Sequence, residues 1–263
     1  MLRIKKSCLV LLFTTILSLC CAQSNTHFAL LTDTHISHSN PESTECLQGL
    51  VKLINTTEVD FIVIAGDITQ NADSLSFMIA KQTLDQLKKP YYVIAGNHDY
   101  HEGSTERFKQ TFGDDRFSFQ HKGVKYIGCS ATPIPGTSTG RIEDSTWRWM
   151  EQEVDQQGTN ILFTHYPLLA GDIDKPREIA ERLSQHNVTF ILSGHYHRYM
   201  ATTCGDIPNI IHRAPQRTGD TSIAYTRYEL SNDTIQIYEH TCGNAPTLWL
   251  RLPLQIKQHP YED

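Results

Sequence analysis

The chain has 263 residues, of which 39% are hydrophobic and 20% are charged, and this composition excludes a disordered or fibrous protein. The formal net charge of −6 argues against nucleic-acid binding driven by positive charge, and no sequence feature implies a protein partner. A chain of this length can bury a core without disulfides or a structural metal. It contains 13 histidines, an unusual number that indicates metal or proton chemistry.

Residues 1–22 are typical of an export signal. Three basic residues precede an apolar stretch at positions 8–19, which is too short to span a bilayer of roughly 30 Å as a helix. Small residues at positions 20 and 22 suit cleavage before Gln23. The alternative is a buried N-terminal helix, which is disfavoured because no polar residue breaks the apolar run into an amphipathic pattern.

Cleavage at Cys20 or Cys21, with attachment of a lipid, is a second possibility. The chain is therefore expected to be exported, as a periplasmic or secreted protein or as a lipoprotein anchored to the membrane. Either cut removes three bases and no acids, so that the net charge falls from −6 to about −9. In an oxidising compartment, we predict that Cys204 pairs with Cys242.

Residues 23–263 are expected to form one domain, because no low-complexity linker or internal repeat interrupts them. Apolar runs alternate with helical patterns, which is typical of an α/β domain with buried strands. The predicted strands are Phe28–Thr32, Phe61–Ala65, Tyr91–Ala95, Val124–Cys129, Ile161–Thr164 and Thr189–Ser193. The predicted helices are Pro41–Asn55, Ala72–Lys88, Asp144–Gln157 and Pro176–His186.

The last third of the chain is rich in β-branched and aromatic residues. Three further strands are predicted there, and a turn signal at Asn232-Asp233 separates the last two. We expect them to be antiparallel and to close a second sheet. They are Ile207–His212, Ser222–Leu230 and Thr234–His240, while the tail from Thr247 shows no pattern.

Polar residues follow five of the predicted strands, at the edge where α/β sheets bind ligands. Taken singly, most of these groups fit a helix cap, a turn or a structural histidine. Together they indicate a common site, because charged groups that lose solvent without partners cost free energy and metal ions would supply those partners. In chain order the groups are Asp33-x-His35, Gly66-Asp67, Gly96-Asn97-His98-Asp99, His165 and Gly194-His195-x-His197.

The ligand types point to particular metals. No cysteine is among them, and mixed oxygen and imidazole ligands suit Mn, Fe or Zn. The number of ligands is too large for one tetrahedral zinc. Seven or eight ligands with one shared carboxylate fit two ions, as in two-metal hydrolytic sites. His98 beside Asp99 is typical of an imidazole oriented by a carboxylate.

This ordered set of motifs resembles the calcineurin-like metallophosphoesterase superfamily, and is nearest the bacterial branch that includes cyclic 3′,5′-AMP phosphodiesterases. The resemblance covers the chain from Leu30 to His197. It implies an α/β (α+β) fold in four layers: a β-sandwich of two mixed sheets flanked by helices. One residue departs from the pattern, Tyr166, where the cyclic-nucleotide enzymes often have a second histidine, and this departure leaves the substrate open.

The resemblance also implies the role of each site residue. His98 would face the leaving group, Asp99 would support His98, and Asp67 would bridge two divalent or mixed-valence metal ions. The first metal would be held by Asp33, His35 and His197, and the second by Asn97, His165 and His195.

The implied activity is hydrolysis of a small-molecule phosphodiester or phosphomonoester, with a metal-bridging hydroxide as the nucleophile. Two alternatives belong to other classes: a catalytically inactive metal-binding scaffold on the same fold, and a metal-storage or metal-sensing protein. Scaffolds of this kind typically lack ligands, and a storage site has no need of the His98-Asp99 pair. Weaker candidates, for substrate contacts, are Tyr100, His101, Arg141, Tyr196 and Arg198.

Overall fold

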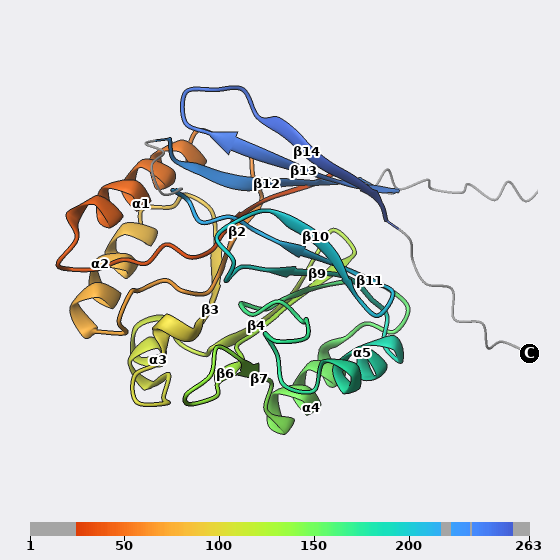
Figure 1. Ribbon diagram of the computed structural model, residues 1–263. Helices are drawn as coiled ribbons and strands as arrows, with labels where there is room; N and C mark the ends of the chain where they lie inside the picture. Colours follow the sequence, from red (N-terminus) through yellow and green to blue (C-terminus); the bar gives the residue numbers. More distant parts are fainter. Residues whose placement is uncertain (1–24, 217–221, 232, 255–263) are drawn as a thin grey trace, which may run out of the picture.

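The computed structural model describes residues 25–216, 222–231 and 233–254; the predicted export signal lies outside them. Two six-stranded sheets pack face to face, and helices cover their outer faces (Figure 1). This arrangement confirms the predicted four-layer fold. Within the described ranges, no helix has the length and apolar character needed to cross a membrane.

The first sheet joins strands from the two ends of the chain. Its order is β14-β13-β12-β1-β2-β3, with β1, β2 and β3 parallel and the C-terminal strands antiparallel. The bounds are β1 Thr26–Leu31, β2 Phe61–Ala65, β3 Tyr91–Ile94, β12 Ala224–Leu230, β13 Thr234–Thr241 and β14 Thr247–Pro253.

The second sheet is built from the middle of the chain. Its order is β10-β11-β9-β8-β5-β4, in which β11, β9, β8 and β5 are parallel and the two edge strands are antiparallel. The bounds are β4 Arg116–His121, β5 Val124–Cys129, β8 Thr159–Phe163, β9 Val188–Ser193, β10 Met200–Cys204 and β11 Ile207–Ile211. A short hairpin, β6 (Thr132–Pro133) and β7 (Gly140–Arg141), stands apart.

In the described part of the chain, five α-helices lie outside the sandwich. The helices α1 (Pro41–Ile54), α2 (Ser74–Leu84) and α3 (Glu106–Phe112) cover the first sheet, and α4 (Asp144–Glu153) and α5 (Pro176–Ser184) cover the second. A 3₁₀ turn, η1, spans Asn97–Asp99. The helix α1 begins where its sequence predicts, because the side chain of Asn40 accepts a hydrogen bond from the Glu42 N–H and Pro41 occupies the first turn.

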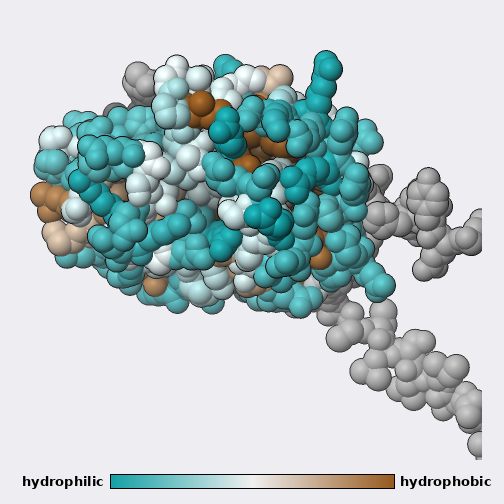
Figure 2. Space-filling view, turned by 90° about the horizontal axis from the view of Figure 1, so that it is seen from below, coloured by the Kyte–Doolittle hydropathy of each residue, from teal (hydrophilic) through white to brown (hydrophobic). Residues whose placement is uncertain are grey.

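The alternation of side chains along each strand divides the core into three apolar layers. In β1, Phe28 and Leu30 face the other sheet, while Ala29 and Leu31 pack under the helices. Strands covered on both faces are apolar throughout, which is why the sequence pattern reveals them. The face of the molecule seen in Figure 2 is mostly hydrophilic, as expected for a chain whose apolar residues fill these layers.

The sequence-based expectations for the last third were partly wrong. The three strands predicted there do not close one sheet, because β11 pairs in parallel with β9 in the second sheet while β12 and β13 extend the first. The sequence pattern also missed β4, β10 and β14, and all three are edge strands. Edge strands are less buried, so their apolar signal is weaker.

The predicted disulfide is also wrong. Cys204 and Cys242 are both free thiols. Cys204 ends β10 in the second sheet and is buried, whereas Cys242 follows β13 in the first sheet and is exposed. Their sequence spacing carried no information about which sheet each residue joins.

His212 links the two sheets and should make folding stability sensitive to acid. Its imidazole contacts the carbonyl of Ser193 and the hydroxyl of Tyr228, and burial lowers its pKa to about 4. The folded protein therefore keeps His212 neutral at pH values where the unfolded chain, with a pKa near 6.5, takes up a proton. The contribution of neutral His212 to the free energy of unfolding is fully present well above pH 6.5 and is lost as the pH falls towards 4.

Because of His212, the free energy of unfolding should be about 2 kcal/mol lower at pH 5 than at pH 7.5. Denaturant unfolding of the wild type and of His212→Gln at pH 5 and pH 7.5 measures it. The variant should lose about 2 kcal/mol less than the wild type between these two pH values, and equal losses would contradict the assignment.

Candidate metal centre

All nine predicted site residues follow the carboxyl ends of parallel strands. Three of these strands belong to the first sheet and two to the second. Because the sheets are stacked, the loops from both sheets meet at one edge of the sandwich. The loops carry Asp33 and His35 after β1, Asp67 after β2, Asn97, His98 and Asp99 after β3, His165 after β8, and His195 and His197 after β9.

One group of donor atoms brings together Asp33, His35, Asp67 and His197, whose ligand atoms lie within 4.8 Å of one another. The Nε2 atom of His197 is 3.2 Å from Oδ1 of Asp33 and 3.0 Å from Nε2 of His35. The Nε2 atom of His35 is 3.8 Å from Oδ2 of Asp67.

A second group shares Asp67 with the first and adds His165 and His195. The Nε2 atom of His165 lies 3.2 Å from Oδ2 of Asp67 and 3.1 Å from Oδ1 of Asn97. These nitrogen and oxygen donors suit cations such as Mn, Fe or Zn. The residues present therefore fit a pair of metal ions with Asp67 between them.

Hydrogen bonds behind the cluster orient its members. The Nδ1 atom of His165 donates to the carbonyl of Ala65 at 2.9 Å, which leaves Nε2 free for a metal. Oδ2 of Asp33 accepts from the hydroxyl of Thr32 and from the N–H of His195. Such outer contacts fix the tautomer and the direction of a ligand before any ion arrives.

The ligand loops are locally strained. Among the described residues, nine that are not glycine have positive φ, and five of these are predicted ligands: Asp33, His35, Asp67, His195 and His197. Each costs of the order of 1–3 kcal/mol, so the surrounding structure must enforce these conformations. Backbone bonds do so in part, because the N–H of Asp33 donates to the carbonyl of Gly66 and the N–H of His35 to that of Asp67.

Two motif glycines are needed because ligands approach their backbone closely. A Cβ atom on Gly194 would lie 1.9 Å from Oγ1 of Thr32 and 2.7 Å from Oδ2 of Asp33. A Cβ atom on Gly96 would lie 2.2 Å from Oδ1 of Asp67. Any larger residue at these positions would displace a predicted ligand.

The carboxylates and imidazoles of the centre shift one another's pKa values. Burial would lower the pKa of His165, but the charge of Asp67 and the hydrogen bond to it raise that pKa to about 9. Burial would raise the pKa of Asp67, but the charges of the surrounding histidines lower it. Without metal, a proton on His165 therefore balances the buried carboxylates at neutral pH.

Metal binding should release this proton. A ligand imidazole must be neutral, so metal affinity is expected to rise with pH up to about 9, by about tenfold per pH unit for one proton. Calorimetric titration of the metal-free protein in buffers with different ionisation enthalpies counts the protons released. An affinity that does not change between pH 7 and pH 8.5 would refute this assignment of the proton.

His98 and Asp99 occupy the centre, but not as a pair. The carboxylate of Asp99 accepts hydrogen bonds from the backbone N–H groups of Ile68, Thr69 and Gly96, and so ties two ligand loops together. The Nδ1 atom of His98 instead donates to the carbonyl of Gln70 at 2.8 Å. The expected support of His98 by Asp99 is thus replaced by a backbone carbonyl.

The other ring nitrogen of His98, Nε2, differs from Nδ1 in its surroundings. It makes no hydrogen bond with the described part of the chain, and the ring of His98 lies 4.8 Å from that of His35. The backbone N–H of His98 donates to Oδ1 of Asp67. The Nε2 atom is therefore left without a partner from the described residues.

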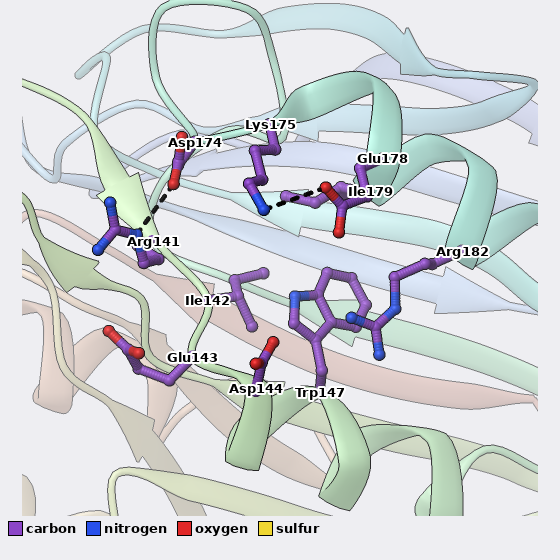
Figure 3. Close-up of a pocket in the computed structure, with 10 residues that line it drawn as sticks. All are labelled: Arg141, Ile142, Glu143, Asp144, Trp147, Asp174, Lys175, Glu178, Ile179 and Arg182. Atoms are coloured by element: carbon purple, nitrogen blue, oxygen red, sulfur yellow. Dashed lines mark hydrogen bonds and ion pairs between the residues drawn. The ribbon is translucent and has the colours of Figure 1, made fainter.

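Two of the weaker candidates for substrate contacts, Arg141 and Tyr196, have carboxylate partners. Arg141 binds Asp174 at 2.9 Å and lines a cavity of about 350 Å³ between β7, α4 and α5 (Figure 3), whose lining includes none of the nine predicted site residues. Tyr196 donates a hydrogen bond to Asp172. Asp172 and Gln70 do not directly follow a predicted strand, so the sequence pattern did not predict them as site residues.

The chain is similar in sequence to proteins named as phosphoesterases. The chain is 24% identical over 195 residues to a probable glycerophosphodiester phosphodiesterase of Arcobacter nitrofigilis, and the match covers 68% of this chain and 71% of that protein. It is 28% identical over 146 residues to the mouse serine/threonine-protein phosphatase CPPED1, covering 48% of this chain and 47% of that protein. The match therefore spans only about half of the length of the mouse relative.

The fold has a counterpart among solved structures. A dimetal phosphatase from Danio rerio superimposes with a TM-score of 0.70 and 13% identity over 88% of this chain and 99% of that one; at this identity, the likeness concerns the fold. A model of the calcineurin-like phosphoesterase family matches residues 26–199, a span that contains all nine predicted site residues. The chain belongs to the calcineurin-like phosphoesterase family.

Proposed function

We propose that this chain hydrolyses phosphoric esters with the help of two metal ions, which are Mn, Fe or Zn. The observation that carries the proposal is the convergence of seven predicted ligands from five loops into two groups that share Asp67. When bound, two ions at such a site would make water nucleophilic near neutral pH and would neutralise phosphate oxygens. This second effect allows an anionic substrate to approach an acidic chain.

The side chains then have distinct tasks. Asp33, His35 and His197 would hold one ion, Asn97, His165 and His195 the other, and Asp67 both. His98 would carry a proton on Nε2 and give it to the leaving oxygen, because its Nδ1–H is already committed to Gln70. Asp99 would keep the loops after β2 and β3 in register.

The substrate is a small molecule with a phosphodiester or phosphomonoester group. The bacterial relative is named for diester hydrolysis and the mouse relative for phosphatase activity, and both reactions suit a site of this kind. Export, predicted from residues 1–22, favours a substrate outside the cytoplasm over an intracellular second messenger.

One assay tests the proposal. The protein is stripped of metal with a chelator, refilled with Mn, Fe or Zn, and offered bis-nitrophenyl phosphate, nitrophenyl phosphate and cyclic nucleotides. Hydrolysis that depends on added metal is expected, and the ratio of the rates separates diester from monoester specificity. If the protein binds two metal ions but hydrolyses none of these esters, the inactive scaffold becomes the better description.

A further inference from the structure

The segment that carries His195 and His197 is supported from outside the metal centre. The residue between these two histidines, Tyr196, donates a hydrogen bond from its hydroxyl to Oδ2 of Asp172 at 2.5 Å. Asp172 is 8% exposed and lies in the loop between β8 and α5. Hydrogen bonds of this length to a carboxylate are among the stronger ones in proteins.

Asp172 can act as a rigid support because its own loop is hydrogen-bonded to the hairpin strand β7. The carbonyl of Asp172 accepts from the N–H of Gly140 at 2.8 Å, and the N–H of Asp174 donates to the carbonyl of Gly140 at 2.8 Å. Gly140 in turn packs against the ring of Tyr166, so closely that a Cβ atom there would lie 2.4 Å from it. The ring of Tyr166 contacts that of His195, at 4.7 Å between centroids.

The segment from His195 to His197 needs this support because its backbone conformation is strained. His195 and His197 both have left-handed backbone conformations, with φ values of 71° and 54°. The side chain of His197 is 49% exposed, so packing contributes little to its position. The two histidines belong to different donor groups, and one support between them therefore acts on both.

We propose that Asp172 is a positioning residue of the metal centre. Through the hydroxyl of Tyr196, it holds the backbone from which His195 and His197 reach the two metal positions. The inference rests on the proposed function, because it concerns how the two ions are held, and it adds a residue outside the family motifs to the machinery of the site.

Variants that break this single hydrogen bond test the inference. In Tyr196→Phe, Asp172→Ala and the double variant, the metal-free protein is titrated with Co²⁺, with chelator competition for affinity and the visible spectrum for coordination geometry. Outer contacts of metal ligands are worth about 10–100-fold in affinity, and each single variant should lose affinity within this range with an altered Co²⁺ spectrum. The double variant should bind no more weakly than the weaker single variant, because both changes remove the same interaction.

Two further variants sharpen the result. Asp174→Ala removes a carboxylate two residues away, whose partner is Arg141 (Figure 3), and it should keep the wild-type affinity and spectrum. Asp172→Asn retains a neutral acceptor for the Tyr196 hydroxyl and should restore part of the loss seen in Asp172→Ala. A purely structural role for the loop would affect Asp172→Ala and Asp174→Ala alike.

The outcomes separate this inference from the proposed function. If the wild type binds fewer than two Co²⁺ ions, the proposed function fails. If the wild type binds two and Tyr196→Phe binds them with unchanged affinity and spectrum, the positioning role is overturned. Tyr196→Phe removes one oxygen atom and decides the question even where Asp172→Ala does not fold.

Discussion

Asp67→Ala is expected to lose both metal ions and almost all hydrolytic activity. Asp67 is the one carboxylate that contributes to both groups of donors, and it also accepts the backbone N–H of His98. Metal ions supply several kcal/mol of transition-state stabilisation, so their loss should lower kcat by at least about 10³-fold. Metal analysis of the purified variant, together with the rate on a diester, measures both effects.

The control for this prediction comes from the same strand. Asp60 directly precedes β2, whereas Asp67 lies beyond its other end. The carboxylate of Asp60 is paired with Lys122, away from the metal centre. Asp60→Asn should therefore keep two ions and the wild-type rate. Two ions per chain in Asp67→Ala would show that Asp67 does not hold both of them.

His98→Ala is expected to keep its metal ions and lose about 10²–10⁴-fold in kcat on esters with poor leaving groups, the usual contribution of general acid catalysis. The Nε2 atom of His98 is the free end of an imidazole whose other nitrogen is held by Gln70. A nitrophenol leaving group needs little protonation, so the loss on nitrophenyl esters should be much smaller. Comparing kcat for alkyl and nitrophenyl esters at equal metal content measures the difference.

The comparison of leaving groups also tests whether His98 is the proton donor. An equal loss on both kinds of ester would mean that His98 positions substrate or metal and donates no proton. His38→Ala provides the control, because His38 is an exposed histidine whose partner is Asp73, and its replacement should change neither metal content nor rate.

The sequence predicted the central part of the sandwich because those strands are covered on both sides. The predicted strands at Phe61–Ala65 and Val124–Cys129 coincide with β2 and β5. The pattern failed at edges such as Thr247–Pro253, where the exposed residues of β14 break the apolar run. Each predicted helix also extends beyond the observed one, because the final residues enter caps and turns, as Asn55 does after α1.

The motifs determined the identity and order of the predicted ligands and their place at strand ends, since those properties are encoded within a few residues of chain. Only the tertiary structure decided which residues meet. His35 and His197 are 162 positions apart and come together through the stacking of the two sheets. Other contacts join neighbouring strands of one sheet: Asp99 binds backbone of the loop after β2 instead of His98, and Asp172, which lies outside every motif, reaches Tyr196 in the loop after β9. Contacts of this kind depend on which strands and which layers come to lie side by side, and no local pattern of residues records that.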